Sequence, residues 1–150
     1  MQRADIQTLL SDHRKREQLL DALCEQLQQS EARLYSVAAQ QLSAMPAGGQ
    51  TVQDRTGEHL IAVEEIRKEI SELCSRQRSE RCYIEQLCKP LSVDQRQIIR
   101  LRYVDALSWA ECTRLLFGRH GDFERKAASY SRRAYQIHVD AMAALQNKKG

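Results

Sequence analysis

Two helix-start signals follow one another within the segment 91–116, and they constrain the fold of this chain more than any other feature. Ser92 is followed three residues later by Gln95, and Ser108 is followed three residues later by Glu111. In such a capping box the serine hydroxyl accepts a free N–H of the first helical turn. The Gln or Glu side chain in turn accepts the backbone N–H of the serine. The sequence therefore predicts two short helices in succession.

Apolar residues fill the helical positions that follow each start. The first helix ends at the step 105–107, and the second begins after Ser108. The second helix has a predicted buried stripe of Trp109, Cys112, Leu115 and Leu116. A short helix followed by a turn and a basic helix is the helix-turn-helix layout, which presents side chains to a DNA groove.

The turn after the second helix is longer than a minimal helix-turn-helix needs. Gly118 and Gly121 are expected to end the preceding helix, and Asp122 is a good N-cap for the next one. Apolar residues then recur at helical spacing, which predicts a last helix from about 122 to 146. His138 is expected to be a packed or a capping residue of this helix. The recurring residues are Phe123, Ala127, Tyr130, Ala134, Ile137, Ala141 and Leu145.

The opposite face of the last helix has the residue types that bind DNA. Arginine forks onto guanine and glutamine onto adenine, whereas serine, lysine and further arginines grip phosphates. The predicted base-reading residues are Arg132, Arg133 and Gln136. The predicted backbone contacts are Arg125, Lys126, Ser129 and Tyr130, with Arg114 and Arg119 as flanking phosphate clamps. Asp140 is expected to end this strip, because a carboxylate repels phosphate.

Two long amphipathic helices are predicted before this region. The first, from Asp5 to about Leu42, has a ladder of Ile6, Leu10, His13, Glu17, Leu20, Cys24, Leu27, Glu31, Leu34, Ala38 and Gln41, widened by Leu9, Leu19 and Leu23. The second, capped by Asp54 or Thr56, has a ladder of Leu60, Val63, Ile66, Ile70, Leu73, Gln77, Arg81, Ile84 and Leu87 and ends at Pro90. Pro46, Gly48 and Gly49 place a hinge loop at 43–55.

These patterns predict an all-α chain in two domains. Residues 1–90 are expected to form a long antiparallel helical hairpin, and residues 91–150 a helix-turn-helix DNA-binding domain. One hairpin buries only one side, so we expect its remaining apolar surface to pack against the C-terminal domain or against another copy of the chain, which makes a homodimer the expected assembly. His13 faces the seam as a tolerated polar residue and not as a metal ligand.

Composition agrees with this assignment. A charged fraction of 29 % with six Gly and two Pro favours long helices over sheets. No apolar run is long enough to span a bilayer and no signal segment is evident, so we expect no membrane contact and a cytoplasmic, DNA-associated location in a bacterial host cell. The five cysteines form no C-x-x-C pair and are expected to be buried or semi-buried thiols, and no metal or other cofactor is predicted.

Basic charge is concentrated where the helix-turn-helix signal lies. Residues 1–88 contain 11 Lys and Arg against 14 Asp and Glu, whereas residues 89–150 contain 12 against 6. Neutralisation of phosphates supplies most of the sequence-independent affinity for nucleic acid. The distribution favours double-stranded DNA as the partner of the C-terminal part, although a solvated basic surface would show the same asymmetry.

The C-terminal motifs resemble the fourth conserved region of sigma-70-class bacterial sigma factors. They read LRY at 101–103, SWAE at 108–111 and IHVDAMAAL at 137–145. With the segment SAMPAGG at 43–49, the whole chain resembles the phage-encoded RinA and ArpU type of late-gene activator. The long turn after Leu116 and the pair Val139-Asp140 depart from those patterns. The resemblance implies regulation of phage packaging or lysis genes through promoter-proximal DNA, with host RNA polymerase as a further partner.

Other classes of function fit the sequence less well. The serious alternative is an assembly protein, such as a small terminase subunit of the phage packaging machinery or a coiled-coil adapter. Small terminase subunits usually have the DNA-binding part first, whereas here it comes last. We do not expect an enzyme, because the sequence contains no phosphate-binding glycine motif, metal-ligand cluster or nucleophile with an evident base.

Overall fold

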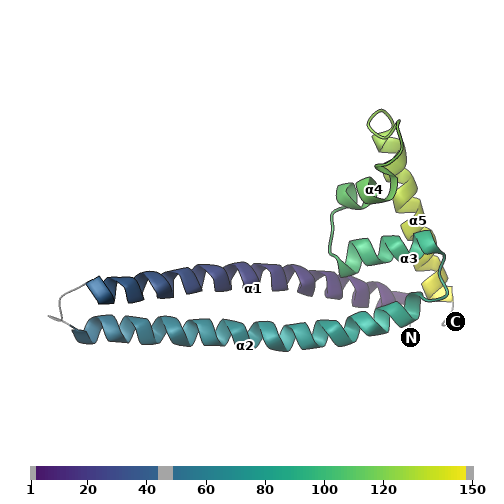
Figure 1. Cartoon of the computed structure of the whole chain (residues 1–150). Coiled ribbons are helices and arrows are strands. Elements are labelled where there is room, and N and C mark those ends of the chain that lie inside the picture. The colour runs from purple at the N-terminus through teal and green to yellow at the C-terminus, as the bar shows by residue number, and fades with distance from the viewer. Residues whose placement is uncertain (1–2, 44–48, 148–150) are drawn as a thin grey trace. The chain divides into compact units, whose positions relative to one another are not determined.

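The computed structural model describes the backbone of residues 3–43 and 49–147. All regular elements in these ranges are helices, which confirms the all-α prediction (Figure 1). They are α1 (Arg3–Ser43), α2 (Gly49–Cys88), α3 (Val93–Ile99), the π-helix η1 (Arg100–Val104), α4 (Trp109–Phe117) and α5 (Ala127–Asn147).

The helix α2 begins earlier than the sequence suggested. The hinge loop was expected over 43–55, with Asp54 or Thr56 as the cap, but the helix already includes Gly49 and the residues after it. Glycine is most costly in a helix interior, and at the first position it costs little. The predicted loop is therefore wrong for Ser43, which is the last residue of α1, and for 49–55, and its remaining part at 44–48 lies outside the described residues.

The chain divides into two compact units, and the division differs from the expected boundary at residue 90. Unit 1 combines Met1–Gln18 with Gln77–Gly150, and unit 2 is Leu19–Arg76. The ends of both long helices thus belong with the C-terminal helices. The physical reason is a shared hydrophobic core.

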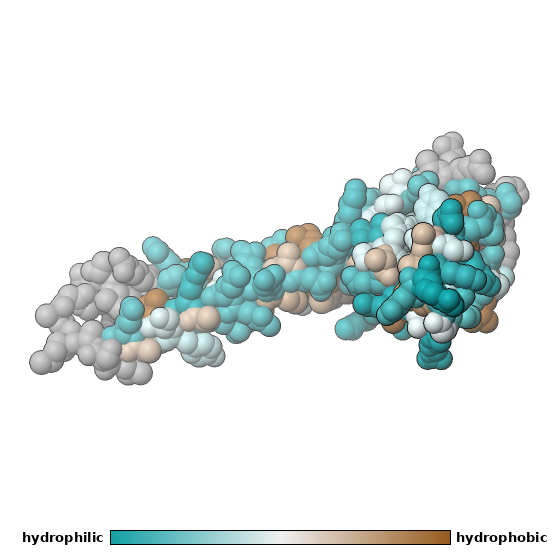
Figure 2. Space-filling view, turned by 90° about the horizontal axis from the view of Figure 1, so that it is seen from above, coloured by the Kyte–Doolittle hydropathy of each residue, from teal (hydrophilic) through white to brown (hydrophobic). Residues whose placement is uncertain are grey.

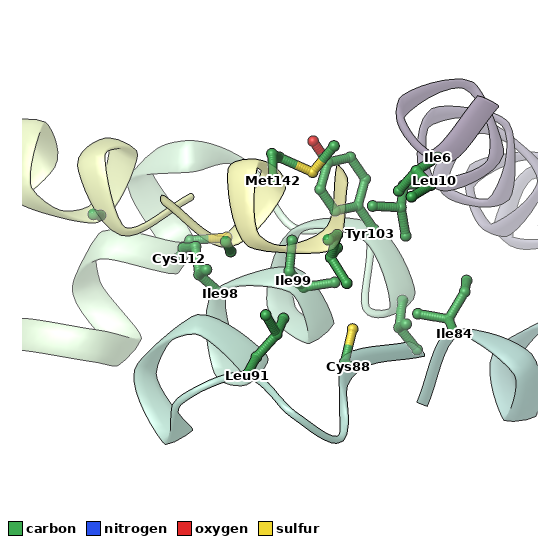
Figure 3. Packing of buried hydrophobic residues seen from close by; sticks show 14 of the residues in the cluster. Ile6, Leu10, Ile84, Cys88, Leu91, Ile98, Ile99, Tyr103, Cys112 and Met142 are labelled. Carbon is green, nitrogen blue, oxygen red and sulfur yellow. The ribbon is translucent and has the colours of Figure 1, made fainter. Parts of the chain in front are cut away.

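The core of unit 1 draws on every helix of the unit. Ile6 and Leu10 of α1 and Ile84 and Cys88 of α2 are buried in the same cluster as residues of the C-terminal helices (Figure 3). The ends of the long helices therefore complete the core of the C-terminal part. The other buried members are Leu91, Ile98, Ile99, Tyr103, Val104, Cys112, Phe117, Ala134, Ala141, Met142 and Leu145.

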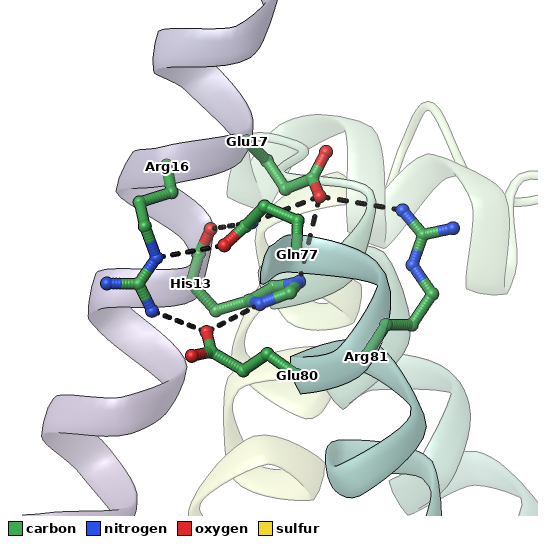
Figure 4. A network of polar contacts seen from close by, with 6 residues as sticks. All are labelled: His13, Arg16, Glu17, Gln77, Glu80 and Arg81. Carbon is green, nitrogen blue, oxygen red and sulfur yellow. Dashed lines mark hydrogen bonds and ion pairs between the residues drawn. The ribbon is translucent and has the colours of Figure 1, made fainter. Parts of the chain in front are cut away.

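A polar layer joins α1 and α2 next to this core (Figure 4). The side chain of His13 is fully buried, and its Nδ1 lies 2.7 Å from Oε1 of Glu80. The buried amide of Gln77 donates to the His13 carbonyl at 3.0 Å and to Glu17 at 3.1 Å. Arg16 donates to the oxygen of the same amide at 2.9 Å. His13 is thus a packed polar seam residue, and a shift in helix register would leave these buried groups unpaired.

Unit 2 consists of the adjoining stretches of α1 and α2, which lie side by side. Arg67 donates to Glu31 across the pair at 2.8 Å. The ladder prediction is correct for its buried members Leu20, Val63 and Ile66, with Leu23 buried as well. It is wrong for Cys24 and for Leu60 and Leu19, which remain 48 % and 46 % exposed, because one neighbouring helix covers only a narrow stripe.

Hydrophilic side chains cover most of the visible face in Figure 2, and apolar side chains form small patches.

Cys88 and Cys112 are buried, but Cys24, Cys74 and Cys82 are exposed free thiols, so the expectation that all five would be buried or semi-buried is wrong. Burial raises the pKa of the Cys88 thiol to about 11, which keeps it protonated at neutral pH.

Candidate nucleic-acid interface

Both predicted serine caps are present, although only the first forms a full box. The Ser92 hydroxyl accepts the N–H of Gln95, whose side chain accepts the N–H of Ser92. The Ser108 hydroxyl likewise accepts the N–H of Glu111 at 3.2 Å, but the Glu111 carboxylate accepts from the hydroxyl itself and not from the serine N–H. Local hydrogen bonding therefore sets the starts of α3 and α4.

The break between the two helices is made by a widened turn. The N–H of Asp105 donates to the carbonyl of Arg100 at 2.9 Å, and the N–H of Leu107 to Leu101 at 3.0 Å. Ala106 has a positive φ of 59°, so the chain leaves the right-handed helical conformation there, just after η1. These contacts hold the start of α4 against η1.

The buried side of α4 differs from the predicted stripe. Cys112, Thr113 and Phe117 are the buried residues, and Trp109 is half-buried. Leu115 is 55 % exposed, so its predicted burial is wrong. Phe117 belongs to the core at the end of α4, whereas Leu115 lies on the exposed side of the helix.

The helix α5 has one buried and one open face. Ala134, Ala141, Met142 and Leu145 are buried against the rest of unit 1. Ser129, Arg132 and Gln136 follow each other at helical spacing on the opposite face, and all three are exposed. The open face lacks acidic residues until Asp140.

The sequence predicted a start of the last helix at about Asp122, but α5 begins at Ala127. The Asp122 carboxylate accepts the Tyr130 hydroxyl at 2.7 Å and pairs with Lys126 at 3.4 Å, so it does not act as a regular N-cap. Backbone bonds from Lys126 to Asp122 and from Tyr130 to Lys126 nevertheless keep a helical phase through this turn. Exposed Arg125 therefore extends the row of Ser129, Arg132 and Gln136, which we call the basic stripe.

The long turn 118–126 is packed around Tyr130. The Tyr130 ring contacts Phe117, His120 and Phe123 with ring centroids 5.2, 5.3 and 5.8 Å apart. The hydrogen bond between Asp122 and Tyr130 lowers the pKa of the carboxyl and raises the pKa of the phenol. Tyr130 and Lys126, both expected at the DNA backbone, thus already have partners within the turn.

The remaining side chains predicted to contact DNA differ in whether another residue of the chain already engages them. The guanidinium of Arg133 lies 5.2 Å from the Phe117 ring centre, so it stacks beside the turn. The Gln136 amide donates to Asp140 at 3.0 Å. Arg132, Arg125, Arg114 and Arg119 are exposed, and no hydrogen bond or ion pair to another described residue engages their side chains.

An aromatic cluster between η1, α4 and α5 was not predicted from the sequence. His138 contacts the rings of Tyr103, Trp109 and Tyr135, with centroids 5.6, 5.0 and 5.8 Å apart. Arg102 lies over the Trp109 ring at 4.7 Å. The single tryptophan was the only sequence signal for it. The cluster joins η1, α4 and α5 and so positions the basic stripe.

Comparison of the chain with protein families, curated proteins and solved structures finds no match. None of the described helices is both long and apolar enough to cross a membrane. In the part of the chain that the structure describes, no three His, Cys, Asp or Glu side chains group as metal ligands.

Proposed function

We propose that the chain is a sequence-specific regulator of transcription that binds double-stranded DNA through α5. The observation that carries this proposal is the basic stripe, a row of exposed polar and cationic side chains on one helix face. The helix lies on α3 and α4, whose starts are set by serine caps. A helix held in this way and open on one face is suited to enter a major groove.

Within the stripe, the contacts suggest different roles for its members. Arg132 has no partner among the described residues and is the strongest candidate for a bidentate contact with guanine. Gln136 would have to leave Asp140 to reach a base, which gives it the weaker claim. We assign phosphate contacts to Arg125 and Ser129.

The test is footprinting and a binding titration on phage DNA over a salt series, with Arg132→Ala compared with Arg78→Ala. Arg78 is an exposed arginine of α2 and provides the same loss of charge outside the stripe. We expect Arg132→Ala to cost about 1–3 kcal/mol of binding and to relax specificity. Arg78→Ala should bind as the unchanged chain does. Equal binding by both variants would remove α5 as the reader.

Regulation of phage late genes is the biological setting that the resemblance to RinA and ArpU regulators implies, with host RNA polymerase as a further partner. A single protected site upstream of a late operon would support this setting. Protection at a packaging site together with ring-sized oligomers would instead support the small terminase alternative. The footprint therefore distinguishes a late-gene regulator from a small terminase subunit.

A second copy of the chain is the protein partner that we propose for unit 2. Its two helices bury few apolar residues between them and leave Leu19, Tyr35, Leu60 and Ile61 between 46 % and 72 % exposed. A helix pair of this kind gains a larger core by pairing with its own copy. A molar mass of one chain in light scattering at micromolar concentration would contradict the homodimer.

A further inference from the structure

A pocket of about 640 Å³ lies between the end of α2 and the successive helices α3 and η1, within unit 1. Its walls are two helical stripes, one from 84–89 and one from 93–105. On the second stripe the lining residues recur at helical spacing, so they share one face of α3 and η1. All lining residues lie between 84 and 105, and the pocket is therefore separate from the basic stripe of α5.

The floor of the pocket is apolar. Ile84 and Cys88 of α2 line it together with Ile99 of α3 and Val104 of η1, and all four are buried members of the core (Figure 3). Val93 continues the wall outward and is 66 % exposed. An apolar body resting on this floor would remove Val93 from water, which is favourable.

The rim of the pocket has an excess of cations. Lys89, Arg96 and Arg100 line it, and the two arginines are one helical turn apart on the same face. All three are exposed, and no hydrogen bond or ion pair with another described residue engages their side chains. The lining carboxylates, Glu85 and Asp105, form no ion pair with them in the described part of the chain.

The size of the pocket favours a small molecule over a helix of another protein. Small-molecule sites have volumes of about 300–1,000 Å³ and are mostly apolar with a few polar groups. The segment 84–89 that α2 contributes is shorter than two helical turns, whereas a docked amphipathic helix needs anchors over two turns. Guanidinium groups bind carboxylates through paired N–H groups. An apolar floor beneath two such groups complements an apolar molecule that has a carboxylate.

We propose that this pocket binds a small apolar acid. Its carboxylate is held by Arg96 and Arg100, and its apolar body lies on Ile84 and Ile99. The inference goes beyond the proposed function, because the site needs no DNA.

The test uses the whole chain with decanoate as the probe, below the concentration at which decanoate forms micelles. Decanol has the same alkyl tail without charge, and decyltrimethylammonium has it with the opposite charge. Isothermal titration calorimetry measures the three affinities. We expect decanoate to bind to one site at least about tenfold more tightly than decyltrimethylammonium, because the arginines attract one head group and repel the other.

The variants Arg96→Gln and Arg100→Gln test the cations at the rim. Each should weaken decanoate binding by about tenfold, which is the usual effect of losing one hydrogen bond to a charged group. The matched control is Arg78→Gln, which removes an exposed arginine of α2 outside the pocket and should leave the affinity unchanged.

Val93 tests the position of the site without disturbing the core, because its side chain is mostly exposed. Val93→Glu places a carboxylate at the wall that competes with the probe for the same arginines, and the first turn of a helix tolerates an acidic residue. Val93→Gln has the same size without the charge. Decanoate should bind more tightly to Val93→Gln than to Val93→Glu.

Two results overturn the proposal. One is no binding of decanoate, or equal affinities for the acid, the alcohol and the ammonium compound. The other is the same decanoate affinity in Arg96→Gln, Arg100→Gln and Arg78→Gln. If the unchanged chain binds no decanoate and Val93→Glu converts a dimer into a monomer in light scattering, a second copy of the chain occupies the pocket instead. Since the calorimetry contains no DNA, a failure of DNA binding would refute the proposed function and leave this inference standing.

Discussion

Nε2 of His138 lies 2.6 Å from the hydroxyl oxygen of Tyr103, which joins α5 to η1 within unit 1. The imidazole also meets the edge of Trp109, and its Nδ1 is buried with no hydrogen-bond partner. Burial, and after it the charge of Arg102, lowers the pKa of His138. The folded chain therefore favours the neutral imidazole.

Mild acid should destabilise unit 1 through His138. Because its folded-state pKa is lowered, the unfolded chain, in which the pKa is about 6.5, takes up the proton first as the pH falls. The stability contributed by the neutral side chain is complete above about pH 6.5 and declines below it by up to about 1.4 kcal/mol per pH unit. Below the folded-state pKa it does not fall further.

Thermal unfolding followed by Trp109 fluorescence at about pH 7.5 and about pH 5.5 measures this effect. The variant His138→Gln keeps a hydrogen-bonding side chain without the titration, and its melting temperature should change less between the two pH values. An unchanged pH dependence in His138→Gln would assign the effect to another group.

The shared core predicts that the end of α2 stabilises the C-terminal helices. Ile84 is 1 % exposed, and Ile84→Ala should reduce the free energy of unfolding by about 2–5 kcal/mol. The matched change Val93→Ala removes apolar atoms from a side chain that is 66 % exposed, and it should alter stability by less than about 0.5 kcal/mol. Denaturant unfolding followed by Trp109 fluorescence reports on the C-terminal helices directly. Similar midpoints for the two variants would contradict the shared core.

Gly118 is required by a close approach of the backbone. A Cβ atom at this position would lie 2.3 Å from the Arg114 carbonyl oxygen, whereas a Cβ at Gly121 would meet nothing within 4 Å. Gly118→Ala should therefore destabilise the chain by about 1–3 kcal/mol. Gly121→Ala should be neutral or slightly stabilising in the same thermal melt. Equal melting temperatures would mean that the end of α4 shifts without cost.

Ala106 is a position where glycine should improve stability. Its φ of 59° lies in the left-handed region, where a Cβ costs about 1–2 kcal/mol. Glycine removes this cost but adds freedom to the unfolded chain, so we expect Ala106→Gly to stabilise by about 0.5–1 kcal/mol. Ala110→Gly, at an exposed position in the first turn of α4, is the opposite control and should destabilise by up to about 1 kcal/mol. A loss of stability in Ala106→Gly would show that the native turn carries no strain.

Much of the candidate reading face could be predicted from residue spacing. Ser129, Arg132 and Gln136 share one face because helix geometry alone places them there. Whether each side chain already has a partner in the folded chain could not be predicted in this way. Asp122 looked like an N-cap, and Tyr130 like a backbone contact, until the turn brought the carboxylate and the hydroxyl together. Nothing in their spacing distinguishes these two uses of an aspartate.

The sequence by itself determined the all-α class and the starts of α3 and α4, because a capping bond joins residues within a single helical turn. The tertiary structure alone decided that Ile6 and Ile84 share a core with α5, and that the Asp122 carboxylate accepts the Tyr130 hydroxyl. Such contacts depend on which helix faces pack together, and helix periodicity identifies an apolar face without identifying its partner.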